Sequence, residues 1–172
     1  SERRQLERAW ERRPGLLGWL SVTTHQAIGM RYIVTAFLFL LAGGIEALIM
    51  RLQLMRANNT LLGPDGYNQM FTTHGTTMMF LFAVPMMEGM AVYLVPLMVG
   101  TRNVAFPRLN LMSLYIFWFG ACFGLYSMVA NAVDTGWTFY TPYSVKTTSA
   151  VIPMIFAAFV MGFSSILTGV NF

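Results

Sequence analysis

Charged residues are scarce in this chain of 172 residues. Asp, Glu, Lys and Arg make up only 10% of it, whereas about a quarter is usual in soluble domains. A single cysteine, Cys122, excludes an intrachain disulfide, and we expect this apolar-flanked thiol to be a small core side chain. CxxC, Walker and GxGxxG patterns are also missing. Together with the 56% of apolar residues, these features exclude a disordered chain, a collagen and a soluble nucleic-acid-binding protein.

Four apolar runs are each long enough to cross a bilayer, which takes roughly 20 apolar residues. They cover residues 32–55, 70–99, 109–133 and 149–172. The segments between them are rich in Asn, Gly, Pro and Asp, which are typical of turns. These segments are 56–69, 100–108 and 134–148. Because lipid cannot pair backbone polar groups, the spans must be helices. We predict an all-α, polytopic transmembrane helical bundle.

The distribution of positive charge predicts the orientation of this bundle. Six arginines precede residue 32 and two lie in segment 100–108, which gives eight on one side of the membrane. The other side has three, namely Arg51, Arg56 and Lys146. The positive-inside rule therefore places the N-terminus in the cytoplasm. We interpret residues 1–24 as a cytoplasmic, basic, amphipathic segment at the interface, with a solvated tail as the alternative.

His74 carries the most chemical information. It lies about one turn into the second run, within Phe-Thr-Thr-His-Gly-Thr-Thr-Met at residues 71–78. An ionisable side chain inside a span indicates a functional site, and neutral imidazole is a good ligand of haem iron. We expect Gly75 to leave room beside it for a flat macrocycle. The alternative is a histidine that merely bonds a carbonyl of a neighbouring helix.

Three other charged side chains lie within the first two runs. Arg51 ends the first run on the side of His74, so we expect both residues at about the same depth. Arg51 is then a cation for a polar haem substituent or, alternatively, a snorkelling arginine at the interface. Glu46 and Glu88 lie deeper, at similar levels. Embedded acids are typical of proton relays, and the alternative is a protonated Glu that bonds a carbonyl.

Polar side chains gather on the predicted cytoplasmic half of the bundle. Hydroxyls and amides there could order a file of waters, although each one alone is typical of a helix–helix hydrogen bond. The set consists of Tyr32, Asn103, Asn110, Ser164, Ser165 and Asn171. Tyr67 and Trp137, in the outer segments, fit an interfacial aromatic belt.

Longer motifs add a family resemblance. They are residues 71–78, YLVPLMVG at 93–100, NVAFPRLN at 103–110, and shorter matches at 136–138, 164–167 and 170–172. Over residues 25–172 the chain resembles subunit I of the haem–copper terminal oxidases, close to the cytochrome c oxidases of the caa3-like bacterial branch. The resemblance implies that these are the first four of about twelve helices in the family fold. The apolar run that reaches Phe172 agrees with a chain that is part of a longer subunit.

The resemblance also implies roles for individual residues. His74 matches an axial ligand of the low-spin haem, which is haem a in a cytochrome c oxidase. Arg51 matches the arginine that bonds the formyl group of this haem, while Trp137 and Tyr67 match residues beside it. A second group matches the lining of a proton pathway that starts at the cytoplasm. Its members are Tyr32, Asn110, Ser164, Ser165 and Asn171.

The entrance of this pathway departs from the family pattern. Asn103 stands where the family commonly has Asp, and Val92 stands where it commonly has Asn. An amide does not take up and release protons, and a valine does not hydrogen-bond water. We hypothesise that Glu88, one helical turn from Val92 on the same face, supplies a substitute group.

The function implied is that of an enzyme that reduces oxygen to water and pumps protons. This stretch would bind the haem that receives electrons, whereas the ligands of the high-spin haem and of copper B would lie beyond residue 172. Expected partners are the rest of subunit I, subunits II and III, cytochrome c, oxygen and the lipid of a bacterial inner membrane, but no nucleic acid. The alternatives are a quinol-oxidising subunit I and a four-helix accessory membrane subunit without a cofactor.

Overall fold

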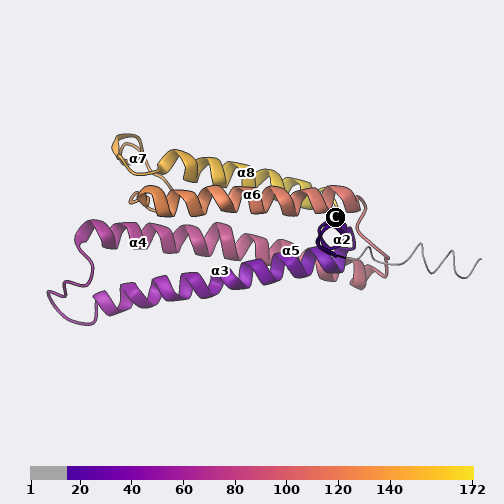
Figure 1. Ribbon diagram of the computed structural model, residues 1–172, viewed down its shortest axis with the longest axis horizontal. Helices are drawn as coiled ribbons and strands as arrows, with labels where there is room; N and C mark the ends of the chain where they lie inside the picture. Colours follow the sequence, from indigo (N-terminus) through magenta and orange to yellow (C-terminus); the bar gives the residue numbers. More distant parts are fainter. Residues whose placement is uncertain (1–14) are drawn as a thin grey trace, which may run out of the picture.

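The computed structural model describes residues 15–172, and every regular element in that range is helical (Figure 1). In chain order these are α2 (Gly15–Ser21), α3 (His25–Gln53), α4 (Pro64–Thr76), the π-helix η1 (Thr77–Ala83), α5 (Val84–Val99), α6 (Pro107–Asn131), α7 (Tyr143–Lys146) and α8 (Val151–Gly169). Four helices are long and apolar enough to cross a membrane: α3, the continuous Pro64–Val99, α6 and α8. The predicted all-α, polytopic bundle is confirmed.

Three of the spans begin earlier than the apolar runs suggested, namely those that start with α3, α4 and α6, whereas α8 begins two residues later. α3 starts at residue 25 rather than 32. Thr24 is the last residue with an extended backbone (ψ 136°), and the helical hydrogen bonds already include the polar residues that precede the apolar run. α4 starts at Pro64, whose missing N–H costs nothing at the first helical position. Asp65 follows it in the first turn, where the helix dipole favours a negative charge. Apolar runs thus report the lipid-facing part of each helix, not its ends.

The second span contains the π-helix η1. Pro85 comes directly after Val84, at the end of η1, and has no N–H for the carbonyl four residues back. The N–H of Val84 bonds instead to Met79, five residues back. A π-turn adds one residue to the helix and so rotates the rest of that helix by about 100°. The face that α5 turns towards α3 is therefore rotated relative to that of α4. A hydrophobic pattern with a period of 3.6 residues does not predict this rotation.

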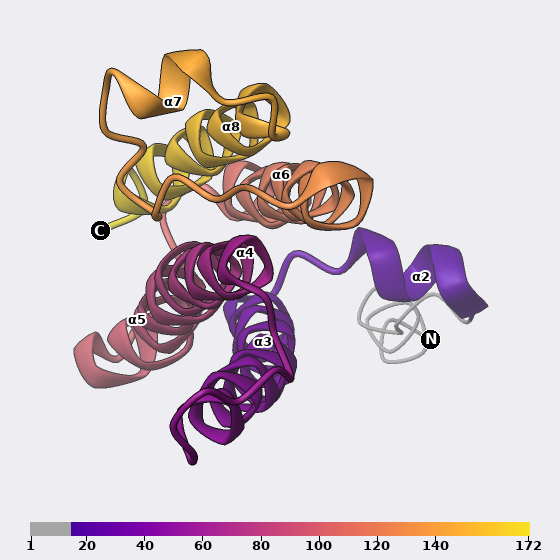
Figure 2. The same ribbon diagram turned by 90° about the vertical axis from the view of Figure 1, so that its left-hand side faces the viewer.

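Two pairs of helices form the bundle. α3 packs along α4, η1 and α5, and α6 packs along α8 (Figures 1 and 2). The buried core between the pairs includes Ile28, Leu81, Leu114 and Ala157. The fully buried Tyr32 of α3 lies against Phe117 of α6, with ring centroids 5.4 Å apart. Tyr32 therefore lies where the two pairs meet.

Glycine permits the close crossing of α3 and α5. A Cβ on Gly89 would lie 2.7 Å from the Cβ of Tyr32 and 3.0 Å from the carbonyl oxygen of Gly29. A Cβ on Gly29 would lie 2.8 Å from the Gly89 carbonyl oxygen. Each glycine leaves space that the backbone of the other helix fills, so the crossing fixes the position of Tyr32.

The two ends of the bundle carry different segments. α2, the 100–106 connection and the C-terminus lie at one end, and the 54–63 connection and α7 lie at the other (Figure 1). This alternation agrees with the predicted loops, whereas the end that faces the cytoplasm stays a prediction. Of the predicted amphipathic segment 1–24, residues 1–14 lie outside the described part. The described remainder contains the short helix α2.

Cys122 does not lie in the core as expected. It is exposed on α6, on a face that no other described helix covers. Other large apolar side chains of α6 are exposed as well, including Phe119, Leu125 and Val129. The apolar neighbours of Cys122 in the sequence therefore did not indicate whether its side chain packs in the core or points away from the described helices.

Candidate functional site

His74 projects from α4 towards α3. Its Nδ1 lies 2.9 Å from the carbonyl oxygen of Gly43. Because a carbonyl only accepts, Nδ1 carries the proton and Nε2 keeps its lone pair. No described residue bonds that Nε2. The hydrogen bond to a carbonyl of a neighbouring helix, which was the alternative to metal binding, is therefore present. It involves Nδ1, and a histidine that binds a metal through Nε2 commonly makes such a bond with its other nitrogen.

Gly43 allows this approach of α4 to α3. It is buried, and a Cβ there would lie 2.6 Å from the sulfur of Met78. A larger residue would push away the segment that follows His74. The carbonyl of Gly43 is thus held within reach of the imidazole by packing, which fixes both its tautomer and its orientation.

Trp137 packs against the residue that follows His74. A Cβ on Gly75 would lie 2.8 Å from Cδ1 of the Trp137 ring, so the space above Gly75 holds an indole. The side-chain space at Gly75 is thus filled by Trp137, whereas the approach of a macrocycle to His74 stays a prediction. The N–H of Gly136 donates to Thr72 Oγ1 at 2.8 Å and ties the loop to α4. Trp137 and His74 are therefore neighbours.

Asp134 organises the same loop, which carries Trp137 and joins α6 to α8. Its carboxylate accepts hydrogen bonds from Tyr143 at 2.6 Å, from Ser149 at 2.9 Å and from Thr147 at 3.0 Å. Burial alone would raise the pKa of Asp134, but these three bonds outweigh it and hold the pKa below its usual value. The loop that carries Trp137 is thus fastened by one ionised carboxylate.

Arg51 and His74 do not lie at the same depth. His74 is level with Gly43, and Arg51 follows Gly43 by eight residues, about 12 Å of helix rise. Side chains on a helix lean towards its N-terminus, so that of Arg51 leans towards the level of His74. Arg51 is exposed among the described residues. Tyr67 precedes His74 by seven residues in α4, two turns along the same face.

A carboxyl group lies beside the imidazole. Glu46 follows Gly43 by one turn, and its Oε1 accepts a hydrogen bond from Thr77 Oγ1 at 3.5 Å. Its Oε2 is buried without a partner among the described residues. Thr77 is the first residue of η1, so the π-helix begins at the residue through which the second span bonds Glu46 of α3.

A hydroxyl cluster surrounds Tyr32. The Tyr32 hydroxyl lies 3.1 Å from Ser113 Oγ and 2.9 Å from Ser164 Oγ. Ser164 donates to the Ser113 carbonyl at 2.8 Å, and Thr168 donates to Ser113 Oγ at 3.1 Å. Ser113 in turn donates to the carbonyl of Asn110 at 2.7 Å. Each hydroxyl hydrogen has a partner, so the cluster is a directed chain.

Ser113 and Thr168 were missed by sequence reasoning. Ser113 follows Asn110 by three residues, and Thr168 follows Ser164 by four, so helical spacing from the predicted residues could have found both. Asn110 itself is fully buried, and neither atom of its amide has a partner among the described residues. An amide with that much unused hydrogen-bonding capacity fits a place on a water file.

Glu88 joins α5 to α8. Ser165 donates a hydrogen bond to its Oε1, and the preceding residue of α8, Ser164, bonds the Tyr32 hydroxyl. Glu88, Ser165 and Thr168 line one cavity of about 310 Å³. Four of the predicted pathway residues are thus brought around one point, namely Tyr32, Ser164, Ser165 and Glu88.

Asn103 and Asn171 lie apart from this cluster and hold backbone. Asn103 Oδ1 accepts from the N–H of His25 at 3.1 Å, and its Nδ2 donates to the Thr23 carbonyl at 3.1 Å. Asn171 Oδ1 accepts from the N–H of Phe106 at 2.8 Å. Both line a cavity of about 290 Å³. Phe172 borders this cavity and that of Glu88, so the two are neighbours.

Metal ligands are sparse in the described part of the chain. Within residues 15–172, no group of three or more His, Cys, Asp or Glu side chains could hold a metal ion. A lone imidazole such as that of His74 would suit a metal that is already held by a macrocycle.

Comparison with known proteins identifies the family of the chain. The family model described as Cytochrome C and Quinol oxidase polypeptide I matches residues 27–172. Cytochrome c oxidase subunit 1 of Thermostichus vulcanus is 45% identical over 153 residues, 86% of this chain and 27% of that protein. The probable cytochrome c oxidase subunit 1-alpha of Streptomyces avermitilis is 38% identical over 168 residues, 94% of this chain and 29% of that protein.

A quinol oxidase is similar as well. Quinol oxidase subunit 1 of Bacillus subtilis is 35% identical over 158 residues, 90% of this chain and 24% of that protein. The chain thus spans less than a third of the length of these relatives.

Proposed function

Because the chain belongs to the family of cytochrome c and quinol oxidase polypeptide I, we propose that it is the part of an oxidase subunit I that holds one side of the low-spin haem. The observation that carries the proposal is the bond between Nδ1 of His74 and the Gly43 carbonyl, which leaves the lone pair of Nε2 without a partner among residues 15–172. A haem held by His74 would supply electron transfer to the oxygen-reducing centre of the subunit. The whole subunit would be an oxygen-reducing, proton-translocating oxidoreductase of a bacterial cytoplasmic membrane.

The residues around His74 then have distinct tasks. The Gly43 carbonyl orients the imidazole and fixes its tautomer. Arg51, two turns towards the outer end of α3, would bond a polar substituent at the rim of haem a and favour its reduction by placing positive charge nearby. Trp137, pressed against Gly75, and Tyr67 would exclude water from the same edge.

The hydroxyl cluster supplies the second half of the proposal. We infer that Tyr32, Ser164 and Ser165 line a proton pathway that leads inward from the end of the bundle bearing Asn103 and Asn171. Asn110, buried with its amide unpaired, would bond waters of that pathway. Glu88 would exchange protons there, because it is the acid that borders the cluster.

Cytochrome c is the proposed electron donor, with subunits II and III as further partners. The similarity to cytochrome c oxidases reaches 45% identity, against 35% for the quinol oxidase. Copper in subunit II separates the two: a purified oxidase that contains more than one copper supports cytochrome c, and one with a single copper supports quinol. High-spin haem and copper B would be bound by residues outside this stretch.

The haem assignment is tested with His74→Asn in the complete oxidase. We expect the a-type band of the low-spin haem to vanish from the reduced-minus-oxidised spectrum. The matched control is His25→Asn, which removes the only other imidazole of the chain and should leave that band in place. A His74→Asn enzyme that keeps a normal low-spin spectrum would refute the proposal and leave a four-helix subunit without a cofactor.

A further inference from the structure

A buried cation that has no anionic partner among residues 15–172 lies at the end of the bundle that carries α2. Arg31, six residues into α3, is only 8% exposed. Its Nη2 donates to the Trp19 carbonyl, and its guanidinium carbon lies 4.1 Å from the centroid of the Trp19 ring. Its Nη1 is buried and has no hydrogen-bond partner among the described residues. Trp19 thus holds the guanidinium in place and leaves part of its donors unused.

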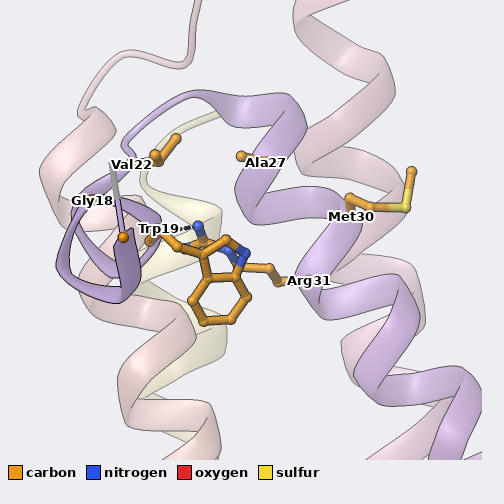
Figure 3. A pocket seen from close by; sticks show the side chains of 7 residues that line it. Gly18, Trp19, Val22, Ala27, Met30 and Arg31 are labelled. Atoms are coloured by element: carbon orange, nitrogen blue, oxygen red, sulfur yellow. Dashed lines mark hydrogen bonds between the residues drawn. The ribbon is translucent and has the colours of Figure 1, made fainter. Parts of the chain in front are cut away.

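Arg31 lines a cavity of about 330 Å³ between α2 and α3 (Figure 3). The Trp19 ring and the small or apolar residues Gly18, Val22 and Met30 form much of the wall. No acidic side chain of the described residues borders it. An unpaired charge in such surroundings is costly, so the cavity is built for an anion.

A second cavity of about 290 Å³ continues from the first. It shares Trp19 and Arg31 with it and extends one turn further along α3, to Val34 and Thr35. Its far wall is Trp118 of α6, which stacks on Trp19 with ring centroids 6.1 Å apart and 13° between the planes. The two cavities together therefore pass from a cation to an apolar, aromatic groove along a membrane-spanning helix.

We propose that this pair of cavities binds one anionic phospholipid. Its phosphate pairs with the guanidinium of Arg31, and an acyl chain lies in the groove between Val34 and Trp118. Arg31 is about 9 Å from the start of α3, the depth at which a spanning helix meets the headgroups. Arginine pairs well with phosphate, and indoles are enriched at this level of the membrane. A free phosphate would match the cation but leave the apolar groove empty.

The test uses the complete oxidase, stripped of lipid in detergent and titrated with phosphatidylglycerol while bound lipids are counted by native mass spectrometry. We expect one tight site, which Arg31→Gln weakens about tenfold through the loss of a charge-assisted bond. Arg108→Gln is the matched control, because Arg108 is an exposed arginine at the same end of the bundle. Equal affinity in the wild type and Arg31→Gln, or an equal loss in both variants, would overturn the proposal.

A second variant separates lipid from free anion. Val34→Trp fills the groove and leaves Arg31 intact, so it should also remove the tight phosphatidylglycerol site. Inorganic phosphate at millimolar concentration should not displace the lipid. Displacement by phosphate, or unchanged lipid binding in Val34→Trp, would contradict an acyl chain in the groove. The haem absorption spectrum of each variant reports whether the enzyme is folded. A variant that lacks this spectrum is replaced by Arg31→Lys, which keeps the positive charge but loses the planar stack on Trp19.

Discussion

Gly89→Ala tests the helix crossing that positions Tyr32. The added Cβ would lie 2.7 Å from the Cβ of Tyr32, about 0.7 Å short of ordinary contact, and 3.0 Å from the Gly29 carbonyl oxygen. These are atoms at or next to the backbone, so α3 must move as a unit. Overpacking of this kind costs about 2–3 kcal/mol, against which alanine gains about 1 kcal/mol in helix propensity. We expect a net loss of about 1–2 kcal/mol.

Gly162→Ala is the matched control in α8. A Cβ there meets nothing within 4 Å among the described residues. The same substitution should therefore be neutral or stabilise by up to about 1 kcal/mol. Both variants are compared as purified oxidase in detergent, by the temperature at which the haem absorption spectrum is lost. The crossing predicts that Gly89→Ala melts below the wild type and Gly162→Ala does not.

The reciprocal variant, Gly29→Ala, sharpens the test. Its Cβ would meet the Gly89 carbonyl oxygen at 2.8 Å, so both substitutions strain one crossing. Once the helices have moved apart for one alanine, the second costs less, and the double variant should lose less than the sum of the two. Equal melting temperatures for Gly89→Ala and Gly162→Ala, or strict additivity in the double variant, would refute the packing argument.

Two further predictions concern ionisable groups. Glu88→Gln should slow oxygen consumption and proton uptake together, because an amide fills the same space beside Ser165 but does not exchange protons; unchanged uptake and turnover would contradict the role of Glu88. Asp134→Asn should loosen the loop between α6 and α8 and shift the low-spin haem spectrum through Trp137. Because the pKa of Asp134 is lowered in the folded state, its stabilisation is complete above the usual carboxyl pKa and is lost as pH falls through the lower folded-state value. The wild-type spectrum should therefore change in acid while that of Asp134→Asn does not, and identical acid profiles would contradict this assignment.

Much of the bundle was predictable because lipid imposes one solution on long apolar runs. The number of spans and the positions of the connections followed from hydropathy and turn residues alone. The π-helix η1 did not, because its cause is local. Pro85 has no N–H to donate, and the preceding N–H of Val84 bonds to the carbonyl five residues back instead of four. The starts of α3 and α4 were also missed, since helices continue through polar residues at the interface.

The candidate site was predictable in its residue types but not in its distances. An ionisable residue in a span pointed to His74, yet no pattern indicated that Gly43 would supply its hydrogen bond. Equal depth for Arg51 failed because the antiparallel register between α3 and α4 depends on packing at Gly43, not on the ends of the apolar runs. Gly75 was read as open space because sequence alone does not show that a loop more than sixty residues later, fastened at Thr72, returns an indole to it.

Asn103 shows why a departure from a family pattern can be structural. Its amide accepts from the N–H of His25 through one end and donates to the Thr23 carbonyl through the other. An ionised aspartate could accept the first bond but could not make the second, so the amide ties the 100–106 connection to the start of α3 more completely. Because an amide does not take up or release protons, this position cannot exchange them. The proposed pathway then requires an acid elsewhere, and Glu88, which borders the next cavity and the Tyr32 cluster, is the acid that the packing of α5 against α8 provides.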